Sequence, residues 1–243
     1  MSRKLRKIVL GIRCDQRMFR VLAHGGVVID ALLALRGDKI DREYFTQITT
    51  SPQRDQYEVQ SESKGNSCQV TVEGAIITKR QIKEEELDVN EFERTALLLY
   101  STIDAVLGIP EVNRIGIIYE FDIPLRDGEN ANKFLYDHFL NFKCDGVPSN
   151  FIIKMAFKLP TKAGLQNPKD TKDYHNIITQ FGVKLEEGEP REDRLFASID
   201  IQRYFYPPSK IRDQDLIKGH FEYAKKASDA FLKSLKEKGL TVG

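Results

Sequence analysis

The chain has 243 residues, of which 41% are hydrophobic and 30% are charged. This is enough apolar material for one large domain or two small ones, and it excludes a chain that is disordered throughout. The formal net charge of +1 excludes a global electrostatic attraction to nucleic acid or to an anionic membrane, although it is compatible with a local basic patch.

The N-terminal segment carries no recognisable targeting signal. Its apolar run spans only residues 8–10, which is too short for the core of a signal peptide. No window of the sequence is long and apolar enough for a transmembrane helix. The three cysteines, Cys14, Cys68 and Cys144, are widely spaced and odd in number, which favours a reducing compartment. We therefore expect a cytoplasmic protein without a membrane partner.

The first half of the chain alternates between strand and helix patterns. Residues 7–15 predict a strand, and residues 16–36 predict a helix because apolar side chains recur there at steps of three and four. Three strands are then expected, with the sequences YFTQITT, YEVQSES and CQVTVEGAIITKR. The segment KGN between the second and third of these is typical of a hairpin turn.

A second helix is predicted after an acidic segment. Asp88 and Asn90 are both N-cap candidates, and Glu91 lies three residues after Asp88, as in a capping box. Gly108 and Pro110 are expected to end this helix.

The second half repeats the same order of elements. It begins with a predicted strand at 114–124 and an amphipathic helix over NANKFLYDHFLNF. Three strands follow, with the sequences SNFIIKMAFKLP, DYHNIITQFGVKL and RLFASIDIQRYFYP, and a long final helix is capped by Asp213. We therefore predict an α+β protein made of two similar β-α-β-β-β-α modules, residues 1–109 and 110–243, with mainly antiparallel sheets. The two sheets would join edge to edge or pack face to face around a groove.

The segment VLAHGGVVIDALLAL contains His24-Gly25-Gly26, which resembles the start of the glycine-rich oxyanion loop of esterases. However, the chain has no G-x-S-x-G nucleophile motif. Gly25 lies on the apolar stripe of the predicted helix, where a glycine costs about 1 kcal/mol relative to alanine. We therefore expect a packing or kink role for Gly25 and a partly exposed, non-catalytic His24.

No metal or cofactor site is expected. Phosphate-loop and dinucleotide fingerprints are absent, and no pair of histidines has a metal-ligand spacing. The histidines are His24, His138, His175 and His220. We assign no catalytic residue from the sequence.

The strand SIDIQRYFYPP has two different faces. Strand alternation places Ser198, Asp200, Gln202 and Tyr204 on one face and the apolar row on the other, with Pro207 expected to end the strand. The apolar row consists of Ile199, Ile201 and Phe205, together with Arg203. The polar row is either a solvated outer face or the lining of a groove.

The strand RIGIIYEFD shows a similar contrast. Gly116, Ile118, Glu120 and Asp122 share one face, with Arg114 at the start, and Gly116 would let another backbone or a partner come close. If Glu120, Asp122 and Asp200 shared one cleft, they would suit acid–base chemistry. The candidate ligand- or partner-binding residues are therefore Arg114, Glu120, Asp122, Asp200, Gln202 and Tyr204.

Basic residues gather at the two ends of the sequence. They are Arg3, Lys4, Arg6 and Lys7 at the N-terminus, and Lys225, Lys226, Lys233, Lys236 and Lys238 in the last helix. Lysines near the C-terminus of a helix also interact favourably with its dipole, so these residues alone do not predict nucleic-acid binding.

The segments RIGIIYEFD, DYHNIITQF and SIDIQRYFYPP resemble an uncharacterised, sporadically distributed prokaryotic family of about this length. That family has a mid-chain Arg-x-Gly-hydrophobic strand, which Arg114 and Gly116 match, whereas Ile118 stands in the region of its usual second arginine. The resemblance implies no activity, and its sporadic distribution suggests an accessory of a mobile-element or defence system.

We expect a non-catalytic protein that binds a protein partner or itself. The alternatives are an enzyme that uses carboxylates in a cleft between the modules and a nucleic-acid-binding accessory protein.

Overall fold

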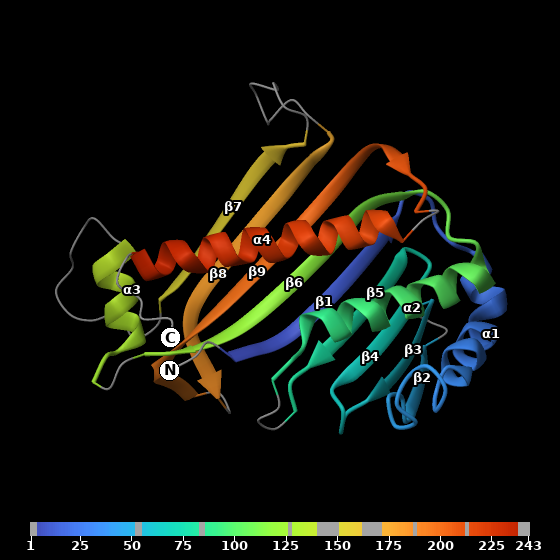
Figure 1. Cartoon of the computed structure of the whole chain (residues 1–243), viewed down its shortest axis with the longest axis horizontal. Helices are drawn as coiled ribbons and strands as arrows, with labels where there is room; N and C mark the ends of the chain where they lie inside the picture. Colours follow the sequence, from blue (N-terminus) through green and yellow to red (C-terminus); the bar gives the residue numbers. More distant parts are fainter. Residues whose placement is uncertain are drawn as a thin grey trace.

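The computed structural model describes residues 4–51, 55–82, 86–125, 128–139, 151–161, 172–186, 189–211 and 214–237. The strands of these residues form one antiparallel sheet of nine strands, in the order β2-β3-β4-β5-β1-β6-β9-β8-β7 (Figure 1). The elements are β1 (Lys4–Cys14), α1 (Arg20–Ala34), β2 (Gln47–Ser51), β3 (Gln56–Ser61), β4 (Asn66–Thr71), β5 (Gly74–Arg80), α2 (Val89–Leu107), β6 (Val112–Pro124), α3 (Ala131–Phe139), β7 (Ile152–Pro160), β8 (Tyr174–Glu186), β9 (Glu189–Ser209) and α4 (Asp215–Glu237). The α+β class is therefore confirmed.

The two halves of the chain share this one sheet. At the centre of the sheet, β1 pairs with β6 in antiparallel orientation. Gly11 lies opposite Gly116, and Val9 lies opposite Ile118. The strands therefore join edge to edge, and the described residues do not form two sheets packed face to face.

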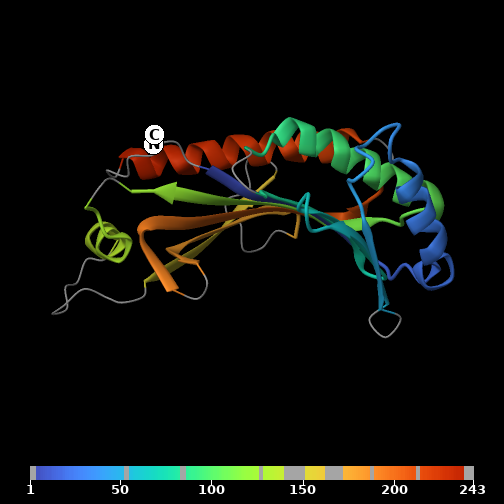
Figure 2. The ribbon, with the colours of Figure 1, turned by 90° about the horizontal axis from the view of Figure 1, so that it is seen from below.

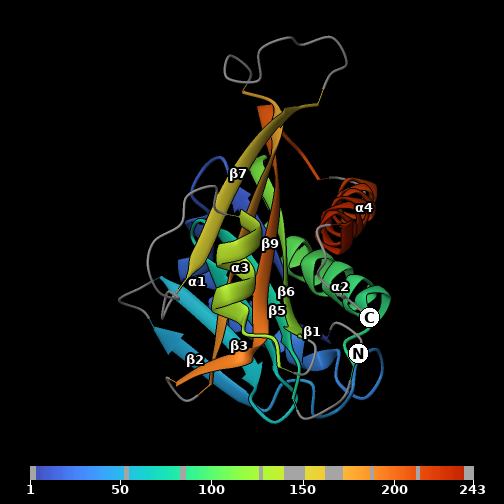
Figure 3. The same ribbon diagram turned by 90° about the vertical axis from the view of Figure 1, so that its left-hand side faces the viewer.

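One face of the sheet is buried beneath helices. Figure 2 shows α2 and α4 along one side of the sheet, with α1 at one end. Many side chains on this face are fully buried, among them Ile8 and Leu10 of β1, Ile117 of β6 and Ile201 of β9. At the other end α3 packs against β8 and β9, where Phe139 stacks 6.2 Å from Phe181 (Figure 3).

The opposite face carries no helix within the described part of the chain (Figure 2). On β2, β3 and β4 it is polar, because register and alternation place glutamine, serine and threonine side chains there. These residues are Gln47, Thr49, Gln60, Ser67, Gln69 and Thr71, with Glu58 among them. This is the pattern of an antiparallel sheet with one solvated face.

The predicted helix boundaries are borne out best at α2. Asp88 is the N-cap, and its carboxylate accepts hydrogen bonds from the backbone N–H groups of Asn90 and Glu91. Gly108 is the C-cap in the left-handed region, with φ of 62°. The proposed cap of the last helix, Asp213, lies outside the described residues.

The helix α1 is unbroken, so of the two roles expected for Gly25, packing and a break or kink, the structure shows packing. Gly25 is buried against Tyr57 of β3, and a Cβ at Gly25 would lie 2.1 Å from the nearest carbon of the tyrosine ring. His24 is exposed, as expected for the neighbouring helix position. The close packing of α1 on the Tyr57 ring therefore explains why a glycine is present at position 25.

Three sequence predictions need correction. The segment CQVTVEGAIITKR, predicted as one strand, forms two strands, β4 and β5, separated by a turn at Val72-Glu73. The strand β9 continues past Pro207 to Ser209, because β8 begins opposite Tyr204 and leaves that flank of β9 without a neighbour. Phe205, expected in the core, is only partly buried and packs beneath the guanidinium of Arg203.

Among the described helices, none combines the length and the apolar character needed to cross a membrane.

Candidate binding cleft on the helix-free face

Two glycines form the floor of a hollow at the centre of the helix-free face. Gly11 and Gly116 face each other across β1 and β6. A Cβ at Gly11 would meet nothing within 4 Å, and a Cβ at Gly116 would lie at ordinary contact distances, 3.6 Å from Gln202 Cγ and 3.7 Å from Asp200 Oδ1. Neither glycine has a positive φ. Packing and backbone conformation therefore do not require a glycine at either position.

The hollow above these glycines is a cleft of about 250 Å³. It crosses β5, β1, β6 and β9, and the turn between β4 and β5 forms one wall. The apolar part of its lining includes Val9, Ile76 and Ile118, and the polar part consists of Arg13, Thr71, Glu73, Arg114, Asp200 and Gln202. We call this hollow the glycine cleft.

A chain of hydrogen bonds organises the β9 side of the glycine cleft. Gln202 Nε2 donates to Asp200 Oδ2 over 2.6 Å, and Tyr204 Oη donates to Gln202 Oε1 over 3.0 Å. Asn176 Nδ2 of β8 donates to the same Gln202 oxygen over 3.2 Å. Arg114 reaches the Tyr204 hydroxyl at 3.5 Å, and its guanidinium lies 5.9 Å from the centre of the tyrosine ring. Side chains from three strands are thereby held in fixed positions.

Asp200 is the acidic residue on the β9 side of the glycine cleft. Burial raises the pKa of its carboxyl above the usual 3.8, while the hydrogen bond from Gln202 and the charges of Arg114 and Lys154 act in the opposite direction. Within the described residues, no cation lies within ion-pair distance of this carboxylate. The carboxylate therefore lies in a partly desolvated site without a direct counter-ion.

The cleft also holds two arginines in different situations. Arg13 is exposed and lies 3.7 Å from the Glu73 carboxylate. Arg114 is partly buried, and among the described residues it has no carboxylate within ion-pair distance. Arg114 and Asp200 are therefore the two charges of the cleft that are not already offset by a close partner.

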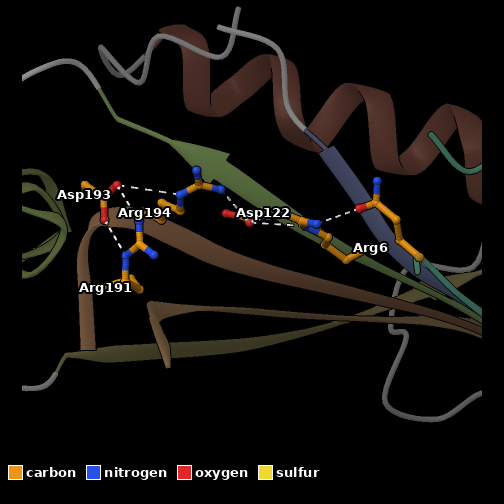
Figure 4. A network of polar contacts seen from close by, with 6 residues as sticks. Arg6, Asp122, Arg191, Asp193 and Arg194 are labelled. Carbon is orange, nitrogen blue, oxygen red and sulfur yellow. Dashed lines mark hydrogen bonds and ion pairs between the residues drawn. The ribbon is translucent and has the colours of Figure 1, made fainter. Parts of the chain in front are cut away.

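The other two carboxylates among the sequence candidates do not line the cleft. Glu120 accepts a hydrogen bond from Lys7 Nζ over 2.8 Å. Asp122 is 2% exposed and lies between two arginines, with Arg6 Nη2 at 2.7 Å and Arg194 Nη1 at 3.0 Å (Figure 4). Both carboxylates are tied to cations of their own, so the arrangement of three converging carboxylates expected for acid–base chemistry does not form.

Figure 4 shows that the contacts of Asp122 belong to a longer network. Arg194 also approaches Asp193 at 3.6 Å, and Asp193 in turn pairs with Arg191 at 3.1 Å. These ion pairs connect β1, β6 and β9, so we assign them a role in holding the three strands together.

The basic residues at the two ends of the sequence differ in their surroundings. Arg6 and Lys7 are engaged with Asp122 and Glu120. The α4 lysines Lys225, Lys226 and Lys233 are exposed. Arg3 and Lys238 lie outside the described residues, as does Cys144, so the structure gives no account of them.

A larger hollow of about 460 Å³ lies between the β4–β5 region and the start of α2. Two of its carboxylates share one cation, since Lys64 lies 3.3 Å from Asp41 and 3.6 Å from Glu43. Asp88 in its wall caps α2, and Lys79 donates to the carbonyl oxygen of Lys64. We regard the glycine cleft as the better candidate, because it brings together Arg114, Asp200 and Gln202, three of the residues that the sequence singles out.

Four of the six candidate residues from the sequence meet at the glycine cleft. Arg114, Asp200 and Gln202 line it, and Tyr204 joins them through hydrogen bonds. Gly11 was not among the residues predicted from the sequence. The one signal that could have identified it is its position in the interior of a predicted strand, where a glycine often marks the close approach of a ligand or another backbone. Among the described residues, no three His, Cys, Asp or Glu side chains gather as metal ligands.

No protein-family model matches the chain, and no curated protein matches it.

Proposed function

We propose that this chain is a non-catalytic binding protein, and that the glycine cleft receives its ligand. The observation that carries the proposal is the pair Gly11 and Gly116, which keeps space open over the sheet. Packing would allow a larger side chain at either position. A glycine in the interior of a strand is normally unfavourable, because it loses more conformational entropy than other residues and provides no side chain to pack. A binding role accounts for this cost.

The polar side chains of the cleft support the same proposal. Gln202 is held by Tyr204 and Asn176, and it in turn holds Asp200. A preorganised polar group beside an apolar surface is the usual composition of a ligand site. The enzyme alternative lacks a comparable observation, since Glu120 and Asp122 are each engaged with cations outside the cleft.

The test fills the cleft without disturbing the fold. Gly11→Val places a β-branched side chain in open space on a central strand, so the variant is expected to be as stable as the wild type or more stable. Wild-type and variant protein are immobilised and exposed to a mixed library of metabolites and short peptides, and retained compounds are identified by mass spectrometry. We expect the wild type to retain a compound that Gly11→Val does not.

The matched control is Gly26→Ala. Gly26 lies on the exposed side of α1, and a Cβ there would also meet nothing within 4 Å. The substitution adds a side chain to another open glycine and favours the helix by about 1 kcal/mol, but it is remote from the cleft. It should leave retention unchanged. Retention of nothing by the wild type, or equal retention by Gly11→Val, would contradict the proposal.

We further propose that the two halves, residues 1–109 and 110–243, are copies of one module. The support is strand order: counted outward from the centre, the first half gives β1, β5, β4 and β3, and the second gives β6, β9, β8 and β7. In both halves a helix follows the first strand and another follows the last. The strand β2 is then an addition to the edge of the first copy.

The remaining sequence-based expectations are also proposals. We propose a reducing, cytoplasmic setting, with which the buried free thiols of Cys14 and Cys68 agree. We likewise propose that the chain is related to the sporadically distributed prokaryotic family that it resembles, and that it serves as an accessory in a mobile-element or defence system.

A further inference from the structure

We propose that the ligand of the glycine cleft is a small zwitterion with an apolar body, of the size of an amino acid or a dipeptide. Its anionic group would bind Arg114, its cationic group would bind Asp200, and its apolar part would lie over the two glycines. This inference rests on the binding function proposed above.

The positions of the two charges carry the inference. Arg114 lies opposite Tyr204 on β9, and Asp200 precedes Tyr204 by four residues on the same face. Four residues of extended strand span about 13 Å. The two residues are therefore anchored on either side of Gly116, and Asp200 Oδ1 reaches to 3.7 Å from the position of a Cβ at Gly116. The positive charge of Arg114 is close enough to act on the Asp200 carboxyl.

Two charges of opposite sign in the cleft, those of Arg114 and Asp200, have no ion-pair partner among the described residues. Glu73, in contrast, offsets Arg13 at the rim. A carboxylate in a partly desolvated site is stabilised by a cation brought by a ligand, and the guanidinium by an anion. A ligand with one charge of each sign satisfies both groups and leaves no excess charge in the cleft.

The remaining surface sets the size and the character of the ligand. The cleft measures about 250 Å³, which lies below the range of roughly 300–1,000 Å³ typical of sites for drug-sized ligands. Its apolar lining, Val9, Ile76 and Ile118, lies beside the glycine floor. Ile76 is 43% exposed, so it presents apolar surface that a ligand would cover.

The experiment removes one charge of the probe at a time. Binding of L-leucine, L-phenylalanine and leucyl-leucine to the full chain is measured by calorimetry and by NMR chemical-shift changes. N-acetyl-leucine lacks the cation, and leucinamide lacks the anion. We expect at least one zwitterion to bind, and its singly charged analogues to bind at least tenfold more weakly.

Matched variants then assign each charge to its residue. Asp200→Asn should remove the preference for leucine over N-acetyl-leucine, and Arg114→Gln should remove the preference for leucine over leucinamide. Lys226→Gln, on the exposed surface of α4, is the control and should keep both preferences. The comparison of analogues on the wild type does not depend on how well the variants fold.

The outcomes separate the two proposals. If the library compound is lost on Gly11→Val but no zwitterion binds, the cleft is a binding site and the zwitterion inference is wrong. If zwitterions bind but both variants keep the wild-type preferences, the assignment of Arg114 and Asp200 is wrong. If the wild type retains no compound and no zwitterion binds, both proposals fail.

Discussion

The ring of Tyr57 on β3 occupies the space into which a side chain at Gly25 on α1 would project, with three ring carbons 2.1–2.4 Å from the position of its Cβ. The tyrosine hydroxyl also reaches the carbonyl oxygen of Leu22 at 3.5 Å. The helix therefore lies directly on the ring, and the glycine sets how closely α1 approaches the sheet.

Gly25→Ala should consequently destabilise the protein, although alanine is the better helix former. Overpacking a well-filled interface typically costs about 1–3 kcal/mol, which exceeds the helix-propensity gain of about 1 kcal/mol. Urea denaturation measures the difference. In the Tyr57→Ala background the same substitution should be neutral or stabilising, and an equal loss in both backgrounds would show that the ring is not the cause.

The stability of the protein should fall as the pH is lowered from 7 to 5, because His220 is buried as the neutral form. Burial between α4 and the sheet lowers the pKa of His220 from the usual 6.5 to about 4, and the nearby His175 and Arg203 act in the same direction. A histidine in the unfolded chain binds its proton near pH 6.5. The stabilising contribution of the neutral, buried His220 is therefore fully present above that pH and is lost as the pH falls toward 4. The loss is at most about 1.4 kcal/mol per pH unit for one histidine.

Denaturation curves at pH 7, 6 and 5 test the histidine prediction. The His220→Gln variant should show a shallower pH dependence, since a glutamine amide can still donate to the Ile201 carbonyl that His220 Nε2 contacts at 3.0 Å. His24→Gln, on the exposed side of α1, should keep the wild-type slope. His175 stacks 3.9 Å from Tyr223, and burial lowers its pKa to about 4 as well, so it should contribute to the wild-type slope.

Asp122→Ala should destabilise the protein strongly, because two arginines would lose their shared partner. Removal of one member of a buried ion pair typically costs about 3–5 kcal/mol. Asp122 is 2% exposed and accepts from both Arg6 and Arg194. Glu120→Gln is the comparison: the Glu120 side chain is 24% exposed, and an ion pair near the surface contributes about 0–1 kcal/mol. Similar losses for the two variants would contradict the structural role of Asp122.

Asp200→Asn should be as stable as the wild type at pH 7, or more stable. Burial raises the pKa of the Asp200 carboxyl, so its favourable contribution is complete below the unfolded pKa of about 3.8 and is lost as the pH rises through the folded pKa. An asparagine can still accept from Gln202 without bearing the charge. Melting temperatures at pH 4 and pH 7 should show a larger advantage of the variant at pH 7. A clear loss of stability would mean that Asp200 serves the fold rather than a ligand.

Much of the local structure follows from the sequence, because each signal lies within a few residues of its effect. The Asp88 N-cap, the left-handed Gly108 and the alternation along β9 depend on neighbouring residues alone. The turn at Val72-Glu73 was missed, because the segment around it has strand propensity on both sides and no Asn-Gly or Asp-Gly signal.

The sequence by itself determined that Asp200, Gln202 and Tyr204 share one face of a strand and that Arg114 and Gly116 share one face of another, since alternation depends only on spacing along the chain. Only the tertiary structure decided that these faces coincide. The pairing of β1 with β6 places Gly11 against Gly116, and the pairing of β6 with β9 places Gly116 against Gln202. Such a register is set by contacts between segments far apart in the sequence and by burial of one whole face, so no local pattern specifies it. The same long-range register also separated Glu120 and Asp122 from the cleft, by bringing Lys7 and Arg6 to them on the neighbouring strand.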